Sequence, residues 1–154
     1  MRLVCTGLSH KTAGVELREK LAFDDAQMRR ALGELAAKWP RAEFVLLSTC
    51  NRVEVYFARA IHAAPSEQDV REWLAGFHGA DVQAVVEAAY GLVDAEAARH
   101  LFAVAAGLDS LVPGEPQIVA QMKQAYAAAV DAGAARSVMN DLFQAAFHVA
   151  KHIR

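Results

Sequence analysis

The sequence predicts an α+β fold in which a βαββαβ sheet layer is followed by a helical subdomain. Two contrasts between the halves of the chain support this. Residues 1–60 contain 9 of the 33 alanines and residues 61–154 contain the other 24, and alanine is the strongest helix former. Residues 1–60 also carry 10 Lys+Arg against 7 Asp+Glu, whereas residues 61–154 carry 6 against 11. We therefore expect a mainly helical second half, and we expect a polyanion to dock on the first half.

Three stretches of the first half are predicted as strands because apolar and β-branched residues dominate them. They are residues 3–8, 43–49 and 53–57. Between the first two, apolar residues recur at spacings of three and four from Met28 to Trp39. This spacing predicts a helix that begins after Asp24 and ends before Pro40.

The next elements complete the pattern. Ser66 and Asp69 have the spacing of a capping box and predict the start of another helix. Residues 82–90 are ambiguous between helix and strand, and we interpret their second half as the fourth strand. The resulting order, βαββαβ, is that of the ferredoxin-like arrangement.

Three helices are predicted after the sheet layer. Asp94 is expected to cap a helix over residues 95–106 that stops at Gly107. Pro116 stands at a first-turn position of the second helix. Ser137 begins the third, which runs to the last residue of the sequence.

Several classes of protein are disfavoured by the sequence. No stretch approaches the roughly 18 uninterrupted apolar residues of a membrane span, and the first residues lack the pattern of a secretory signal. Two cysteines, Cys5 and Cys50, are too few for a disulfide framework. No ligand cluster with metal-binding spacing and no glycine-rich nucleotide motif occurs. We therefore expect no metal site, and no NAD(P) or ATP held by this chain in the usual way.

Cys50 is the strongest candidate for a reactive group. It follows an apolar strand and stands among Thr49, Asn51 and Arg52. If the extended backbone continues, Cys50 and Arg52 point to the same side, where a guanidinium would favour the reactive thiolate. The residues alone leave a second interpretation, a small buried apolar side chain at the end of a strand. Cys5 lies within a predicted strand without polar neighbours, which favours a structural role.

Two further features have both a functional and an ordinary interpretation. His100 lies on the predicted helix over residues 95–106, where a single histidine is either a surface or core residue or a catalytic one. Gln117, Gln121 and Gln124 repeat along one side of the following helix. Such an amide stripe either grips a polar ligand or forms an ordinary exposed face.

Three blocks of sequence carry a family resemblance. They are Gly7-Leu-Ser-His-Lys-Thr-Ala-Gly-Val-Glu-Leu-Arg-Glu-Lys-Leu21, Leu47-Ser-Thr-Cys-Asn-Arg-Val-Glu-Val-Tyr56, and the residues from His100-Leu-Phe through Gly107-Leu-Asp-Ser-Leu-Val-Pro-Gly-Glu-Pro-Gln-Ile118. Together and in this order they resemble glutamyl-tRNA reductase, the first enzyme of tetrapyrrole (porphyrin) synthesis from glutamate.

The resemblance implies that Cys50 is a nucleophile, because the cysteine of the family's Ser-Thr-Cys-Asn-Arg motif has that role. It forms a thioester with the glutamate of glutamyl-tRNA(Glu), and NADPH reduces the thioester to glutamate-1-semialdehyde. His100 matches the family's active-site histidine. Other positions match residues that line the family's glutamate pocket: Thr49, Asn51, Arg52, Ser110, Glu115, Pro116, Gln117 and Gln121.

The resemblance also implies a domain organisation and partners. Residues 1–136 would be the N-terminal catalytic domain and residues 137–154 the start of a long connecting helix, with the NADPH-binding and dimerisation domains outside this chain. We then expect a cytoplasmic fragment that forms the thioester without reducing it. Its expected partners are glutamyl-tRNA(Glu), a second copy in a homodimer and glutamate-1-semialdehyde aminomutase.

Two other hypotheses compete with this one. A non-catalytic ferredoxin-like RNA-binding module would stack bases on aromatic side chains of its sheet, and Tyr56 and Phe57 are the adjacent aromatics available. A small regulatory domain would use Cys50 only as a structural residue.

Overall fold

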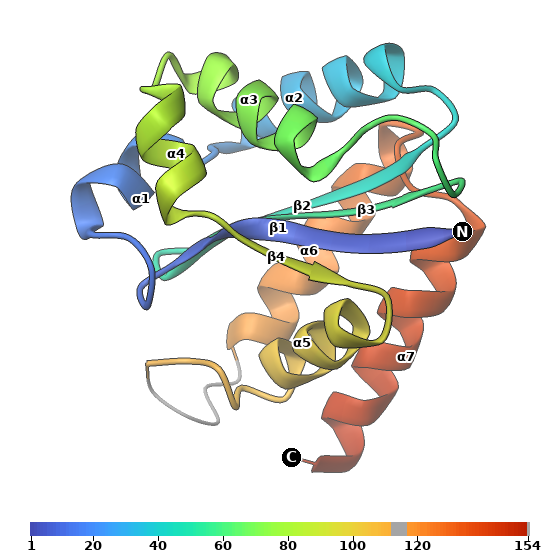
Figure 1. Ribbon diagram of the computed structural model, residues 1–154. Coiled ribbons are helices and arrows are strands. Elements are labelled where there is room, and N and C mark those ends of the chain that lie inside the picture. The colour runs from blue at the N-terminus through green and yellow to red at the C-terminus, as the bar shows by residue number, and fades with distance from the viewer. Residues whose placement is uncertain (112–116, 154) are drawn as a thin grey trace.

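The computed structural model describes residues 1–111 and 117–153 and has a four-stranded antiparallel sheet between two layers of helices (Figure 1). The elements in chain order are β1 (Arg2–Ser9), α1 (Val15–Leu21), α2 (Asp25–Lys38), β2 (Glu43–Ser48), β3 (Arg52–Arg59), α3 (Glu67–His78), α4 (Val82–Ala88), β4 (Tyr90–Val93), α5 (Ala95–Ala105), α6 (Gln117–Asp131) and α7 (Ser137–Ile153).

The sheet confirms the predicted fold class. Its strands lie in the order β2-β3-β1-β4, and each neighbouring pair is antiparallel. This is the strand order of a ferredoxin-like layer, in which β1 and β3 form the centre. The central position of β3 matters for the site, because the residues that follow Cys50 belong to this strand.

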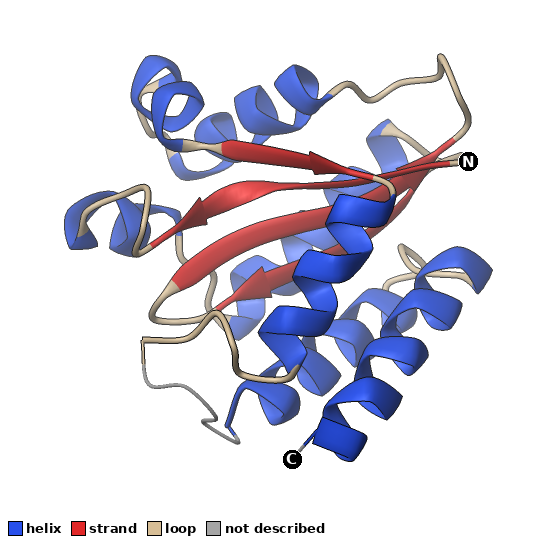
Figure 2. Ribbon diagram, turned by 60° about the horizontal axis from the view of Figure 1, so that its bottom comes forward, coloured by secondary structure: helices blue, strands red, loops and turns tan. Residues whose placement is uncertain are grey.

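Both faces of the sheet are covered by helices. Helices α1 to α4 lie on one side of the strands and α5 to α7 on the other, as Figures 1 and 2 show. Every residue of β3 from Arg52 to Ala58 is consequently buried. Tyr56 packs edge-on against Phe143 of α7 on one face, and Phe57 stacks on Phe44 of β2. These two aromatic rings are not exposed for base stacking, so the RNA-binding module is not favoured.

Most predicted helix ends have the expected caps. Asp24 and Gln27 form a capping box at the start of α2, and Ser66 and Asp69 form one at the start of α3. Gly107, just beyond α5, has a φ of 76°, which is a left-handed conformation that favours glycine. The prediction for Pro116 lies outside the described residues.

Three local predictions differ from the structure. The second half of residues 82–90 is not a strand, because α4 continues to Ala88 and β4 begins at Tyr90. Helix α1 was not predicted, since its seven residues bury only Leu21 and give no periodic pattern. Asp94 stands at the start of α5 but does not cap it. Its carboxylate instead accepts the backbone N–H of Leu3 and pairs with Arg2 of β1.

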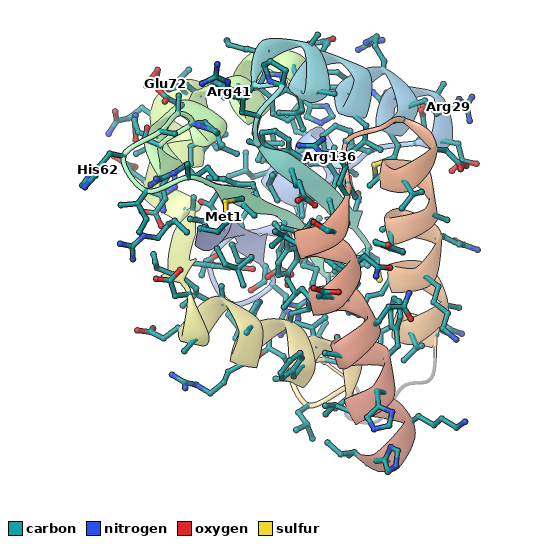
Figure 3. All side chains as sticks on the ribbon, turned by 90° about the vertical axis from the view of Figure 1, so that its right-hand side faces the viewer. Met1, Arg29, Arg41, His62, Glu72 and Arg136 are labelled. Carbon is teal, nitrogen blue, oxygen red and sulfur yellow. The ribbon has the colours of Figure 1, made fainter. Side chains whose placement is uncertain are left out.

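Helix α7 is attached to the sheet by a buried carboxylate. Glu43, the first residue of β2, accepts hydrogen bonds from the backbone N–H groups of Arg136, Val138 and Met139. A negative charge at the first turn satisfies amides that have no partner within the helix. Figure 3 shows Arg136 beside the start of β2, where α7 begins. This contact fixes the last helix against the edge strand.

Gly7 is required by the close approach of two strands. A Cβ at this position would lie 2.3 Å from the carbonyl oxygen of Val53 and 2.7 Å from the Cα of Glu54. Both of those atoms belong to the backbone of β3, which cannot move aside without breaking the sheet. Gly7 is also the residue of β1 that faces Glu54 in the strand register.

We expect Gly7→Ala to destabilise the chain by about 2 kcal/mol, because the added methyl group overlaps the backbone of β3. Gly33→Ala is the matched control, since a Cβ at Gly33 in α2 meets nothing within 4 Å. It should stabilise the chain by about 0.5–1 kcal/mol through helix propensity. Urea unfolding followed by circular dichroism measures both, and a Gly7→Ala chain as stable as the parent would contradict the clash.

Candidate active site

Cys50 lies in a tight turn between β2 and β3 and is exposed. The turn is fixed by Thr49, whose Oγ1 accepts the backbone N–H groups of Asn51 and Arg52 at 3.1 and 3.2 Å. From outside the turn, Arg18 of α1 donates to the carbonyl oxygen of Cys50 at 3.1 Å. The exposure of this thiol disagrees with the interpretation of Cys50 as a buried apolar residue, whereas Cys5 is buried as predicted.

The expected pairing of Cys50 with Arg52 is not found. The extended backbone is interrupted between Ser48 and Arg52, so the period of two that would put both side chains on one side does not apply. Arg52 is instead 2% exposed. Its Nη2 donates to the backbone oxygen of Asp109 at 2.7 Å and to Oδ2 at 3.0 Å, and its Nη1 lies 3.4 Å from Oε2 of Glu54.

Glu54 is the centre of a buried polar cluster. Its carboxylate accepts the hydroxyl of Tyr56 at 2.8 Å and the hydroxyl of Tyr90, and Nε2 of His100 lies 2.5 Å from its Oε2. Glu54 itself is 0% exposed. Because Arg52, Glu54 and Tyr56 alternate along β3, all three face the layer that contains α5. The cluster therefore joins β3, β4 and α5 around one negative charge.

The surroundings keep this carboxylate charged. Burial by itself would raise the pKa of Glu54, but the hydrogen bond and the charge of His100, with Arg52 and Tyr90, outweigh burial and hold the pKa below its usual value. Burial and the charge of Glu54 raise the pKa of Tyr90, so its hydroxyl remains a donor. Burial opposes the charge on Arg52, yet the neighbouring acids raise its pKa.

Asp109 extends the cluster to the surface. Its Oδ1 lies 2.5 Å from Nζ of Lys11, a side chain that is 60% exposed. Burial opposes the ionised form of Asp109, but the hydrogen bonds from Lys11 and Arg52 hold its pKa below the usual value. Asp109 thus fastens the loop after α5 to the end of β1 and to β3. Ser110, the next residue of that loop, is half-buried.

A second histidine lies beside the cysteine turn. The backbone N–H of His10 donates to the carbonyl oxygen of Asn51 at 2.8 Å. Burial and the positive charges of Arg52 and Lys11 lower the pKa of His10, which favours the neutral ring. This contact holds the loop after β1 against the residues that surround Cys50.

A cavity of about 180 Å³ opens beside the cluster. Its lining residues come from β1, the loop after it, β4, α5 and the loop that contains Asp109, and they are Ser9, Lys11, Thr12, Tyr90, Leu92, His100 and Asp109. The lining combines an imidazole with groups of both charge signs.

The predicted site residues fall into two groups. Thr49, Cys50, Asn51 and Arg52 form one turn, which Arg52 links to His100 through Glu54 and to the loop of Ser110 through Asp109. Gln117 and Gln121 are exposed on α6. Gln121 lines a separate cavity of about 200 Å³ together with Ser48 and the start of α2. Glu115 and Pro116 lie outside the described residues.

Three potential metal ligands lie close together within the cluster. One ligand atom each from Cys5, Glu54 and His100 lies within 4.8 Å of the others. The oxygens of Glu54 already accept two tyrosine hydroxyls and face His100 and Arg52. Burial and the charge of Glu54 raise the pKa of the Cys5 thiol, which disfavours the thiolate that a metal would bind. The hydrogen-bond network accounts for this arrangement.

Sequence reasoning did not identify Glu54, Tyr90, Asp109 or Lys11 as parts of the site. A signal for Glu54 was present, because it is the single charged residue between Val53 and Ala58, a stretch that is otherwise apolar or aromatic. Such a charge within a central strand indicates a buried, paired group. Tyr90, Asp109 and Lys11 carry no comparable signal, since each is brought to the cluster from a distant part of the chain.

We expect Asp109→Asn to destabilise the chain by about 1–2 kcal/mol at pH 7, because two cations lose their shared carboxylate. Since the pKa of Asp109 is depressed in the folded chain, its stabilisation is complete above the ordinary aspartate pKa of 3.8 and is lost as the pH falls through the lower folded value. Urea unfolding from pH 7 to pH 2 should show the parent and the variant converging at acid pH. Asp131→Asn on the exposed side of α6 is the control, and a difference independent of pH would contradict the assignment.

Known proteins are similar to this chain over nearly its whole length. Residues 6–154 match the family model described as the N-terminal domain of glutamyl-tRNAGlu reductase. The full chain is 47% identical to part of a glutamyl-tRNA reductase of Marinobacter nauticus and 45% identical to part of one from Shewanella oneidensis, and it covers 35% and 36% of their lengths.

A solved structure of a glutamyl-tRNA reductase is also similar to this chain. The glutamyl-tRNA reductase from Methanopyrus kandleri aligns with 99% of this chain, at 34% identity and a TM-score of 0.77, and the chain covers 34% of that protein. The chain therefore spans about a third of the length of the relatives it matches. Its sequence, its sheet order and its length of match together show that the chain belongs to the family of glutamyl-tRNA reductase N-terminal domains.

Proposed function

We propose that this chain is the catalytic domain of a glutamyl-tRNA reductase and that Cys50 is its nucleophile. The observation that carries the proposal is the position of the thiol. Cys50 is exposed on a turn that Thr49 and Arg18 hold in place, and Arg52, two residues later, lies in the buried cluster of Glu54 and His100. An accessible cysteine on a fixed backbone beside polar groups has the setting of a reactive thiol.

The proposed reaction begins with attack of the Cys50 sulfur on the ester carbonyl that joins glutamate to tRNA. The carbon–sulfur bond forms as the carbon–oxygen ester bond breaks, and the ribose oxygen leaves with a proton. The product is a glutamyl thioester and free tRNA. NADPH supplies a hydride that converts a thioester of this kind to glutamate-1-semialdehyde and restores the thiol.

The described residues do not fit NADPH in the manner of dinucleotide-binding folds. Such folds bind the cofactor at the carboxyl ends of parallel strands, whereas each strand pair described in this chain is antiparallel. We therefore assign NADPH binding to a part of the protein outside this chain. The chain alone would form the thioester and stop there.

Each predicted site residue has a proposed role. His100 moves a proton or orients the substrate from the cavity wall, and Thr49 holds the turn of Cys50. Arg52 binds a substrate carboxylate, which would have to replace the carboxylate of Asp109 now on its Nη2. The remaining predicted residues are proposed to line the glutamate pocket: Asn51, Ser110, Glu115, Pro116, Gln117 and Gln121.

The organisation of the longer protein is also a proposal. Residues 1–136 form the catalytic domain, and residues 137–154, which include α7, begin the helix that connects it to the NADPH-binding and dimerisation domains. A homodimer, the aminomutase as a partner and a cytoplasmic location follow from the same proposal. Within residues 1–111 and 117–153, no helix has the length and apolar character needed to cross a membrane.

We expect the chain to acquire a covalent glutamyl group when it is incubated with glutamyl-tRNA, because thioester formation requires only the nucleophile and the glutamate pocket. Intact-protein mass spectrometry after acid quenching measures the adduct, and neutral hydroxylamine should release it. Cys5→Ser is the control and should be labelled like the parent, since Cys5 is buried.

Cys50→Ala should not be labelled. If this variant acquires the group as efficiently as the parent, Cys50 is not the nucleophile.

A further inference from the structure

The carboxylate of Glu54 is held in one orientation by donors from three elements. Tyr56 Oη donates to Oε1, and Oε2 faces Tyr90 Oη, Arg52 Nη1 and His100 Nε2. Glu54 is fully buried, so no solvent competes for these contacts. A buried carboxylate with several donors is a rigid acceptor. The group that faces His100 is therefore fixed in position before any substrate binds.

The charge of Glu54 decides where the shared hydrogen lies. Its pKa is held below the usual value by His100 and Arg52 against the effect of burial, so the carboxylate carries no proton of its own. An ionised carboxylate accepts hydrogen bonds and donates none. The hydrogen between the two residues consequently belongs to Nε2 of His100, and the neutral ring has the tautomer with hydrogen on Nε2.

We propose that Glu54 is a positioning residue that keeps Nε2–H of His100 directed into the protein and leaves Nδ1 as the nitrogen that exchanges a proton in the cavity. The assignment of the reaction rests on the proposed function, whereas the tautomer does not. His100 lines the cavity and keeps 16% of its side-chain surface exposed. Among the described residues no group hydrogen bonds to Nδ1, so this nitrogen remains available.

A second contact fixes the plane of the ring. The rings of Tyr90 and His100 meet edge to face, with centroids 5.8 Å apart and planes at 65°. The ring of Tyr90 therefore contacts the ring of His100, and the hydroxyl of Tyr90 donates to Glu54. A histidine whose ring plane and tautomer are both set presents one nitrogen in one direction, which is what proton transfer requires.

Nuclear magnetic resonance of the chain labelled with ¹⁵N-histidine tests the proposal without substrate. The expected result is an Nε2–H proton of His100 that exchanges slowly enough to be observed, with a pyridine-type signal for Nδ1 at alkaline pH. Nδ1 protonated in the neutral ring, or an Nε2–H proton lost at once to water, would overturn it. Neither result depends on labelling of Cys50, so failure here is distinguishable from failure of the proposed function.

Three variants separate positioning from folding. Glu54→Leu should abolish the observable Nε2–H proton. Glu54→Gln keeps an oxygen for the three donors that face Oε2 and directs its amide nitrogen towards Tyr56. The His100 tautomer should therefore persist, with exchange of the Nε2–H proton about tenfold faster. Tyr56→Phe removes only the donor to the other oxygen and should leave the His100 signals in place. A Glu54→Leu chain that folds and retains the observable Nε2–H proton of His100 would contradict the proposal. If Glu54→Leu does not fold, exchange of this proton at the parent's rate in Glu54→Gln would contradict it instead.

Discussion

The described site depends on one buried negative charge. A carboxylate enclosed in the protein is strongly unfavourable unless donors replace the water that it loses. Glu54 obtains its partners from its own strand, from β4 and from α5. The three elements must therefore meet at one point, and that point lies at the cavity wall. The absence of a side chain at Gly7, opposite Glu54 in the register, allows β1 and β3 to approach closely there.

The two faces of β3 carry different kinds of side chain, because successive side chains of a strand point to opposite faces of the sheet. One face carries apolar residues into the layer of α1 to α4. On this face Phe57 stacks on Phe44 of the neighbouring strand, and Phe44 contacts Trp39 at the end of α2. The other face carries Arg52, Glu54 and Tyr56 towards the second helical layer. A ferredoxin-like layer with one open face could not bury these polar groups. The helices α5 to α7 supply the third layer, and α5 with the loop after it supplies the polar partners His100 and Asp109.

A series of ion pairs connects the buried Glu54 to the surface of the molecule. Glu54 lies beside Arg52, Arg52 binds Asp109, and Asp109 pairs with the exposed Lys11. These contacts hold the loop of Ser110 close to the turn of Cys50. The thiol is exposed at the edge of this rigid support, which agrees with the role proposed for it as the nucleophile. The chain spans about a third of the length of its relatives.

The sequence by itself determined the order of the strands and of the longer helices, and the identity of the family. Local signals were sufficient for the capping boxes of α2 and α3 and for the alternating strands, and contiguous motifs made Cys50 and its neighbours the candidates for the site. Local signals failed for α1 and α4, which are short, and for Cys50 with Arg52, where a turn replaces the extended backbone. Only the tertiary structure decided that Arg52 binds Asp109 and that Glu54, Tyr90 and His100 form one cluster. Those partners lie between 36 and 57 residues apart in the chain, and no local pattern encodes contacts that arise when separate elements pack around a shared charge.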